Sequence, residues 1–532
     1  MDIPTKSPLA ISDKASSDRA VPTVIRMKES KQRPDHGLAS RFGSALNPLR
    51  HLGSLGFLFF WIIAVTGIYL YAVLDTSATG AYRSIDEISR EQWYLGGLLR
   101  SLHRYSADAF LIVMMAHLIR EWVLGHFQGF RRFSWLTGVP LLLFGFACGV
   151  GGFWLNWDQL GQFSAQATAE WLDSLPLFAS PLTRNFLSTS AVSDRLFSLF
   201  VFIHLGLPLL MLFGSWFHIQ RISLAKVFPP RTLSAVTLTT MVLLAIVAPV
   251  LSHPAADLSR MPTILAMDWF LLFIHPLMYI TSPGFVWGTL TIVLLILLLL
   301  PLWPQTRVTP IAKVDPENCN GCRRCFDDCP YAAVTMVPHP NRGLARQMAQ
   351  VDADLCASCG ICVGACPSST PFRSVAALVT GIDLPSSPIN HLRHELRTQL
   401  GRLQTQKKIV AFGCDHGASV NSLREPGVAA FSLPCIGMLP PSFVEYALRD
   451  GAAGVLVAGC SPDGCEFRLG QQWTEQRLLG QREPHLRTAV PRSRFQMVWA
   501  DSGDEATLKE GLRALRARTD IIPGPFHVAE PA

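Results

Sequence analysis

The sequence predicts a multi-domain protein: an all-α transmembrane bundle of about six helices, then a small α+β domain, then an open α/β domain with a flavodoxin-like sheet. Two observations separate these parts. Long apolar runs are confined to the residues before 304, and they are long enough to cross a bilayer. Of the 13 cysteines, 12 lie after residue 318, where their spacing is typical of metal ligands rather than of a disulfide framework.

The N-terminal residues 1–50 are expected to form a cytoplasmic tail that ends in a surface helix. Residues 1–40 are polar and lack the apolar core of a signal peptide. The formal net charge of +7 comes largely from this tail and from short loops, a pattern that suits membrane topology. Basic and aromatic residues are not interleaved as nucleic-acid binding would require. Membrane lipid is therefore an expected partner, and nucleic acid is not.

Six apolar runs predict the transmembrane helices. They cover residues 52–74, 105–124, 136–155, 197–219, 234–251 and 285–303. The stretch 264–281 is also apolar, but it contains Asp268, His275 and Pro276. We expect it to be a re-entrant or surface segment that lines a cavity, and the alternative is a seventh span.

Loop charges orient the bundle. Arg131, Arg132 and Arg221 fall on the same side as the basic tail, and the opposite loops carry fewer basic residues. The positive-inside rule then places the N-terminus in the cytoplasm, and six spans return the chain there after Trp303. Metal-binding thiolates also require a reducing compartment. Both arguments predict a multi-pass protein of the inner (cytoplasmic) membrane with cytoplasmic cysteine-rich domains.

Four histidines form two pairs with identical spacing inside apolar runs. His103 and His117 are 14 residues apart, and so are His204 and His218. On a helix this spacing puts both imidazoles on one face, about 21 Å apart along the axis. Two such helices can hold two bis-histidine b haems, one from His103 and His204 near the outer surface and one from His117 and His218 near the cytoplasm. The alternative is that each histidine only hydrogen-bonds a neighbouring helix.

With these histidines, residues 45–304 resemble the cytochrome b of bc-type quinol-oxidising complexes. The resemblance divides them into a four-helix di-haem domain, 51–230, and a two-helix region, 231–304, similar to the C-terminal part of that family. It implies that Gly53, Gly67, Gly138 and Gly152, again in pairs 14 residues apart, let the porphyrins approach the backbone. It also implies that Arg100 and Arg120, each three residues from a haem histidine, contact the haem propionates. Helix packing and snorkelling are the alternatives for these glycines and arginines.

The resemblance extends to a quinone site. Met267-Asp268-Trp269-Phe270 stands where the family has Pro-Glu-Trp-Tyr, so Asp268 is the implied carboxylate that accepts a quinol proton. The alternative is an interfacial aspartate that caps a short helix. The resemblance thus implies quinone or quinol as a bound partner, and a homodimer as in bc-type complexes.

Eight cysteines form two runs in residues 311–372. Each run has the spacing Cys-x2-Cys-x2-Cys-x3-Cys-Pro, which is the two-cluster ferredoxin pattern in which the fourth cysteine ligates the other cluster. Two 4Fe-4S clusters are therefore predicted, and zinc is the alternative. The first cluster would use Cys319, Cys322, Cys325 and Cys366, and the second Cys356, Cys359, Cys362 and Cys329.

After a linker at 373–405 with one helix, the pattern alternates strands and helices. Strands are predicted at 408–413, 428–433, 454–458 and 495–500, and helices at 442–450, 468–479 and 505–518. Four cysteines follow the strand ends, where ligands of parallel sheets gather. A 2Fe-2S cluster on Cys414, Cys435, Cys460 and Cys465 is predicted, and scattered buried cysteines are the alternative.

This last segment, 406–532, resembles the delta subunit of methyl viologen-reducing hydrogenase. The motifs Phe412-Gly413-Cys414, Leu433-Pro434-Cys435 and Val457–Cys465 carry the resemblance. It implies a soluble, flavin-containing partner similar to heterodisulfide reductase. The whole chain is then expected to be a subunit of a quinone-linked oxidoreductase that conducts electrons across the membrane. A membrane tether without a working quinone site and a redox sensor are the alternatives, and the sequence leaves the direction of electron flow open.

Overall fold

The computed structural model describes residues 47–177, 180–186, 192–259, 264–303, 310–341, 345–369, 378–462, 464–521 and 526. The tail predicted for residues 1–40 lies outside these ranges, as does most of the predicted surface helix. Of that helix only the short 3₁₀ turn η1, Pro48–Arg50, is described.

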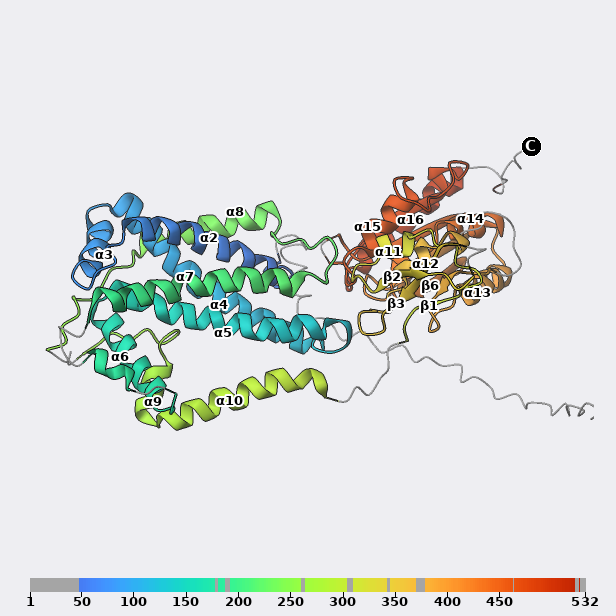
Figure 1. Cartoon of the computed structure of the whole chain (residues 1–532). Coiled ribbons are helices and arrows are strands. Elements are labelled where there is room, and N and C mark those ends of the chain that lie inside the picture. The colour runs from blue at the N-terminus through green and yellow to red at the C-terminus, as the bar shows by residue number, and fades with distance from the viewer. Residues whose placement is uncertain are drawn as a thin grey trace, which may run out of the picture. The chain divides into compact units, whose positions relative to one another are not determined.

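Helices occur at all six positions where the apolar runs predicted them (Figure 1). They are α2 (Leu52–Val73), α4 (Leu98–Val123), α5 (Arg132–Asn156), α7 (Asp194–Ile219), α8 (Arg231–Val247) and α10 (Pro283–Leu299). In the described part of the chain, four segments are long and apolar enough to cross a membrane: Leu52–Val73, Gly129–Asn156, Asp194–Ile219 and Pro283–Leu302. Helix α4 is long enough but carries several charges, and α8 has only 17 residues.

Helix α4 begins seven residues before the predicted span, so His103 lies well inside it. Three shorter helices lie outside the predicted spans: α3 (Ala81–Arg90), α6 (Gln159–Asp173) and α9 (Ile274–Ile280). The segment 264–281 forms a loop followed by α9, in agreement with a segment that does not span. Its His275 is buried and lies 3.1 Å from the Ser164 hydroxyl on α6.

The bundle exposes apolar side chains on its outside. Ile68 on α2, Phe202 on α7 and Val247 on α8 are 72%, 73% and 80% exposed. Many large apolar side chains exposed on one helical bundle are typical of a membrane or protein contact surface. Inside the bundle, α2 packs against α4 and α5 packs against α7, so the two histidine-bearing helices each have a close neighbour.

The eight-cysteine region is a small α+β fold. Strand β2 (Val334–Pro338) pairs with β3 (Gln347–Val351), and β1 (Lys313–Val314) pairs with β4 (Ile382–Asp383), both antiparallel. The one-turn helices α11 (Arg324–Asp327) and α12 (Ile361–Ala365) follow the first cysteines of each run.

The C-terminal region is built on a parallel sheet. Its strands are β5 (Lys408–Cys414), β6 (Val428–Leu433), β7 (Ala452–Gly459) and β8 (Phe495–Trp499), in the order β6-β5-β7-β8. This is the strand order of doubly wound flavodoxin-like sheets. Each of these strands overlaps the range predicted for it. Helices α14 (Ser442–Arg449), α15 (Gly470–Leu478) and α16 (Glu505–Ile521) lie near the predicted positions.

Both faces of this sheet are buried, as a parallel sheet requires. Val410 and Phe412 of β5 pack with Phe443 of α14 on one face. Ile409 and Ala411 point the other way and pack with the leucines of α16. Helix α13 (Ile389–Arg402), in the segment predicted as a linker, buries its leucines in the first of these cores.

Candidate functional site

Each of the four predicted haem histidines faces a glycine on the neighbouring helix. His103 and His117 on α4 face Gly67 and Gly53 on α2, and His218 and His204 on α7 face Gly138 and Gly152 on α5. A Cβ added at Gly67 would lie 3.0 Å from His103 Cε1, and the corresponding distances are 3.1 Å at Gly138, 3.2 Å at Gly152 and 3.6 Å at Gly53. The glycines therefore leave the room that these imidazoles occupy.

Three of the imidazoles have a neutral hydrogen-bond partner for Nδ1. That of His103 lies 3.0 Å from the Ile63 carbonyl, that of His204 lies 3.2 Å from the Cys148 carbonyl, and that of His218 lies 3.0 Å from Thr137 Oγ1. A histidine that binds a metal through Nε2 normally donates its Nδ1 hydrogen to such a group. The ring centroids of His103 and His204 are 6.4 Å apart, so α4 and α7 present them to each other. These residues fit a bis-histidine haem.

His117 differs from the other three. Within the described residues its Nδ1 is buried without a hydrogen bond, and a carboxylate oxygen of Glu121 lies 4.0 Å away. The two residues are one helical turn apart on α4, the spacing at which side chains meet. His117 is thus the only one of the four whose Nδ1 is near a charged group among the contacts the structure describes.

The two arginines implied as propionate partners lie close to the histidines but have protein partners here. Arg100 is buried and donates to Ser89 Oγ at 2.6 Å and to Asn156 Oδ1 at 2.9 Å. Arg120 lies 2.7 Å from Glu121. The role of either arginine toward a haem remains a prediction.

Asp268 is fully engaged with protein groups. Its carboxylate forms an ion pair with Arg104, which also contacts Asp108 one turn along α4. Its other oxygen accepts the backbone N–H groups of Phe270 at 3.0 Å and Leu271 at 2.8 Å, and so caps the turn that leads into α9. This geometry is that of the capping alternative, and a proton-accepting role would require the ion pair with Arg104 to open.

The eight ferredoxin-type cysteines line two separate cavities. Cys319, Cys322, Cys325 and Cys366 line one of them. Cys329, Cys356, Cys359 and Cys362 line the other. This is the crossed grouping in which each run contributes its fourth cysteine to the other site. The donor set therefore fits two cubane clusters.

Burial makes these sulfurs poor thiolates by themselves. It raises the pKa of Cys325 and of Cys359 to about 12. Buried thiols of this kind ionise at neutral pH only when a cation such as cluster iron compensates the charge. The chemistry of the donors thus agrees with metal ligation rather than with reactive free thiols.

The four C-terminal cysteines meet at the carboxyl edge of the parallel sheet. Cys414 ends β5, Cys435 and Cys460 follow β6 and β7, and the sulfurs of Cys414 and Cys460 are 3.7 Å apart. Cys465 contacts Cys460. Hydrogen bonds from Cys435 and Cys460 lower the pKa of Cys414 well below its ordinary value, which favours a ligating thiolate there. Convergence at this edge fits an iron–sulfur site, and the 2Fe-2S cluster on these four cysteines stays a prediction.

Several site residues were not predicted from the sequence. Thr66 and Thr137 contact His103 and His218, at 3.1 and 3.0 Å, but threonines in apolar helices are common and give no signal. Glu121 could have been noticed, since a carboxylate four residues from a predicted haem ligand is rare in an apolar run.

Comparison with known families identifies three regions. Residues 39–225 match the family cytochrome b/b6/petB, residues 314–370 match the 4Fe-4S dicluster domain, and residues 409–520 match the methyl-viologen-reducing hydrogenase delta subunit. All three resemblances expected from the sequence are confirmed. A solved structure titled "Hyperthermophilic respiratory Complex III" is 20% identical, with a TM-score of 0.38, and the match covers 47% of this chain and 74% of that one. The family matches make this chain a membrane electron-transfer subunit with cytochrome b and iron–sulfur regions.

Proposed function

We propose that this chain links the quinone pool to a cytoplasmic oxidoreductase through two b haems, two 4Fe-4S clusters and one 2Fe-2S cluster. The observation that supports it most is the set of four histidine–glycine contacts, two on each helix pair and at two depths of the bundle. Bound haem iron and iron–sulfur clusters each take up and release one electron at a time. The protein's part is to fix their ligands, depths and surroundings.

The proposed orientation places His103 and His204 near the outer surface and His117 and His218 near the cytoplasm. It rests on the loop charges and on the reducing compartment that the cysteines need. In this arrangement α4 and α8 also cross the membrane, which makes six spans. The charges of α4 are then inside the bundle, where Arg104 is paired with Asp108 and Asp268.

The soluble partner that we propose is a flavin-containing subunit similar to heterodisulfide reductase. The match of residues 409–520 to the methyl-viologen-reducing hydrogenase delta subunit supports it by analogy, because a subunit of a redox enzyme exchanges electrons with its partners. Copurification of the full chain from its native membrane, with a flavin spectrum in the complex, is the expected result.

A second function is favoured by the geometry of Asp268. Because Arg104 and two backbone N–H groups already hold this carboxylate, the domain could serve as a tether and relay without a working quinone site. The variant Asp268→Asn decides between the two. We expect loss of quinone-linked turnover, with recovery in Asp268→Glu, if the carboxylate accepts a proton.

Asp108→Asn is the matched control, because Asp108 pairs with the same Arg104 from within α4. Equal losses in both variants would mean that the ion pairs act structurally, and unchanged turnover in Asp268→Asn would favour the tether. The haem assignment itself is tested by a reduced-minus-oxidised spectrum of the protein in detergent. A spectrum without b-type absorbance, or with one centre instead of two, would refute the proposal.

A further inference from the structure

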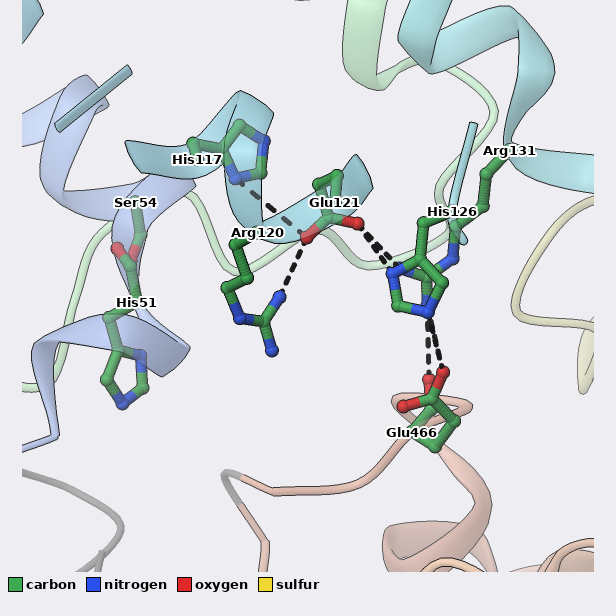
Figure 2. A network of polar contacts seen from close by, with 8 residues as sticks. All are labelled: His51, Ser54, His117, Arg120, Glu121, His126, Arg131 and Glu466. Carbon is green, nitrogen blue, oxygen red and sulfur yellow. Dashed lines mark hydrogen bonds and ion pairs between the residues drawn. The ribbon is translucent and has the colours of Figure 1, made fainter. Parts of the chain in front are cut away.

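A polar network joins the end of α4 to the C-terminal domain. Figure 2 shows its four members, Glu121, His126, Arg131 and Glu466, which we call the junction network. His126 bridges the two carboxylates, with Nδ1 2.7 Å from Glu121 and Nε2 3.2 Å from Glu466. Arg131 bridges them a second time, at 3.2 Å from Glu121 and 3.6 Å from Glu466. An imidazole and a guanidinium are therefore shared between two carboxylates that are far apart in the sequence.

The network reaches a predicted haem ligand at one end. Glu121 lies 4.0 Å from Nδ1 of His117, which has no hydrogen bond there among the described residues. A carboxylate beside the second nitrogen of a ligating histidine makes the imidazole more basic and tunes the metal. Arg120 also contacts Glu121, at 2.7 Å, so the charge that His117 experiences depends on how the cations around Glu121 are shared.

The network reaches the iron–sulfur region at its other end. Glu466 follows the predicted ligand Cys465, and Arg468 donates to the Leu224 carbonyl at 3.0 Å. Beside it, Ser223 donates its backbone N–H to the Pro330 carbonyl and its hydroxyl to the Cys329 carbonyl, both at 3.0 Å. The ring of Phe130 lies 4.5 Å from that of Tyr331, which lines the second cysteine cavity. The contacts at this end of the bundle thus hold the second ferredoxin site and the Cys465 loop.

The four members are partly shielded from water. Their side chains are between 14% and 23% exposed, so their charges are screened less than those of a surface pair. Removal of the Glu466 carboxylate would leave Glu121 as the one network carboxylate that His126 and Arg131 contact. Glu121 would then be neutralised more completely, and His117 would experience less negative charge.

We propose that the junction network couples the His117 haem site to the docking of the C-terminal domain. Glu121 is the positioning residue for His117, and Glu466 acts on Glu121 through His126 and Arg131. The inference rests on the proposed function, since it assigns an electronic role at the haem that His117 and His218 hold. It also assigns the next electron-transfer step to the second ferredoxin site, on Cys329, Cys356, Cys359 and Cys362, because Ser223 and Phe130 contact that site.

The test is a potentiometric titration of both haems in the full-length protein in detergent, with dithionite as reductant and redox mediators. Loss of a negative charge beside His117 favours the ferrous form. For Glu121→Gln we expect the one-electron reduction equilibrium of that haem to shift about tenfold, or 59 mV, to higher potential. For Glu466→Gln we expect a smaller shift in the same direction. The haem held by His103 and His204 is the internal control and should not move.

Amide hydrogen exchange in residues 124–131 and 219–228 is the second measurement. We expect faster exchange in Glu466→Gln than in the unmodified protein, because His126 and Arg131 lose one of their two carboxylates. The matched control is Glu510→Gln, a change of the same kind on the exposed side of α16. It should alter neither the potentials nor the exchange. If Glu121→Gln loses the haem that His117 and His218 hold, the reduction potential of that haem in Glu466→Gln tests the inference by itself.

Two outcomes would overturn the inference alone: two normal haems with unchanged potentials in Glu466→Gln, or equal shifts of both haems. A wild-type protein without b-type absorbance would overturn the proposed function together with it. The spectrum of the unmodified protein therefore distinguishes the two failures before any variant is made.

Discussion

The glycines that face the haem histidines give a graded prediction, because their contacts differ by tenths of an ångström. In Gly67→Ala the new methyl group would lie 3.0 Å from His103 Cε1, closer than carbon atoms normally approach. In Gly53→Ala the corresponding distance to His117 is 3.6 Å, which is ordinary contact. The same chemical change therefore crowds the facing imidazole at one end of α2 and leaves it room at the other.

The expected magnitude follows from overpacking. An extra methyl group in a well-packed interior costs about 1–3 kcal/mol, and about 1.4 kcal/mol is a factor of ten in an equilibrium constant. We therefore expect Gly67→Ala to weaken retention of the His103 haem by about 5- to 150-fold. Alanine also favours a helix over glycine by up to about 1 kcal/mol, but both variants share this gain, so their difference isolates the contact.

The assay is the haem-to-protein ratio after purification in detergent, combined with a redox titration that separates the two haems. Gly206→Ala on α7 is a further control, because a methyl group there meets nothing within 4 Å. The reasoning would be refuted if Gly53→Ala lost as much haem as Gly67→Ala. Full retention of both haems, with unchanged spectra, in Gly67→Ala would refute it as well.

Three more predictions concern the soluble side of the molecule. Burial disfavours the imidazolium of His126, but hydrogen bonds to the two network carboxylates raise its pKa above the usual value of about 6.5. The charged imidazole therefore stabilises the loop after α4 below pH 6.5, and this stabilisation is lost as the pH rises through the raised pKa of His126. Amide exchange in that loop should accelerate above this pKa in the unmodified protein, and this pH dependence should be absent in His126→Gln. Asp328→Asn leaves the fully buried guanidinium of Arg477 without a counter-charge, at a cost of about 3–5 kcal/mol, and limited proteolysis of the full chain should be faster. Cys322→Ser and Cys359→Ser should each remove one cluster, or about four iron atoms per chain. The two variants should lose different paramagnetic signals. Zinc in place of iron in the unmodified protein would contradict this prediction.

The secondary structure was largely predictable from local patterns. The six apolar helices and the four parallel strands follow from hydrophobic periodicity, which is a property of neighbouring residues. The start of α4 was placed seven residues too late, because Arg100 and Arg104 interrupt the apolar run although their partners lie inside the bundle. The helices α3 and α6 were not predicted, since they are short and not apolar.

The candidate ligands were also predictable, but their surroundings were not. Histidine pairs and cysteine runs repeat at spacings that helices and cluster loops impose, so the sequence alone singles them out as candidates. The sequence did not predict the ion pair between Asp268 and Arg104, because the two residues are 164 positions apart along the chain. Only the folded structure shows that this carboxylate is held by a charged partner and by two backbone donors.

Taken by itself, the sequence determined the order of the three regions and the candidate ligands of the redox sites predicted in them, since each depends on short-range spacing. The tertiary structure decided which glycine faces which histidine, how the eight cysteines divide between two cavities and where the regions touch. Arg131 and Glu466, 335 residues apart, meet because the fold brings opposite charges from two distant segments together. No periodic pattern in the sequence predicts such a contact, so only the folded structure shows it.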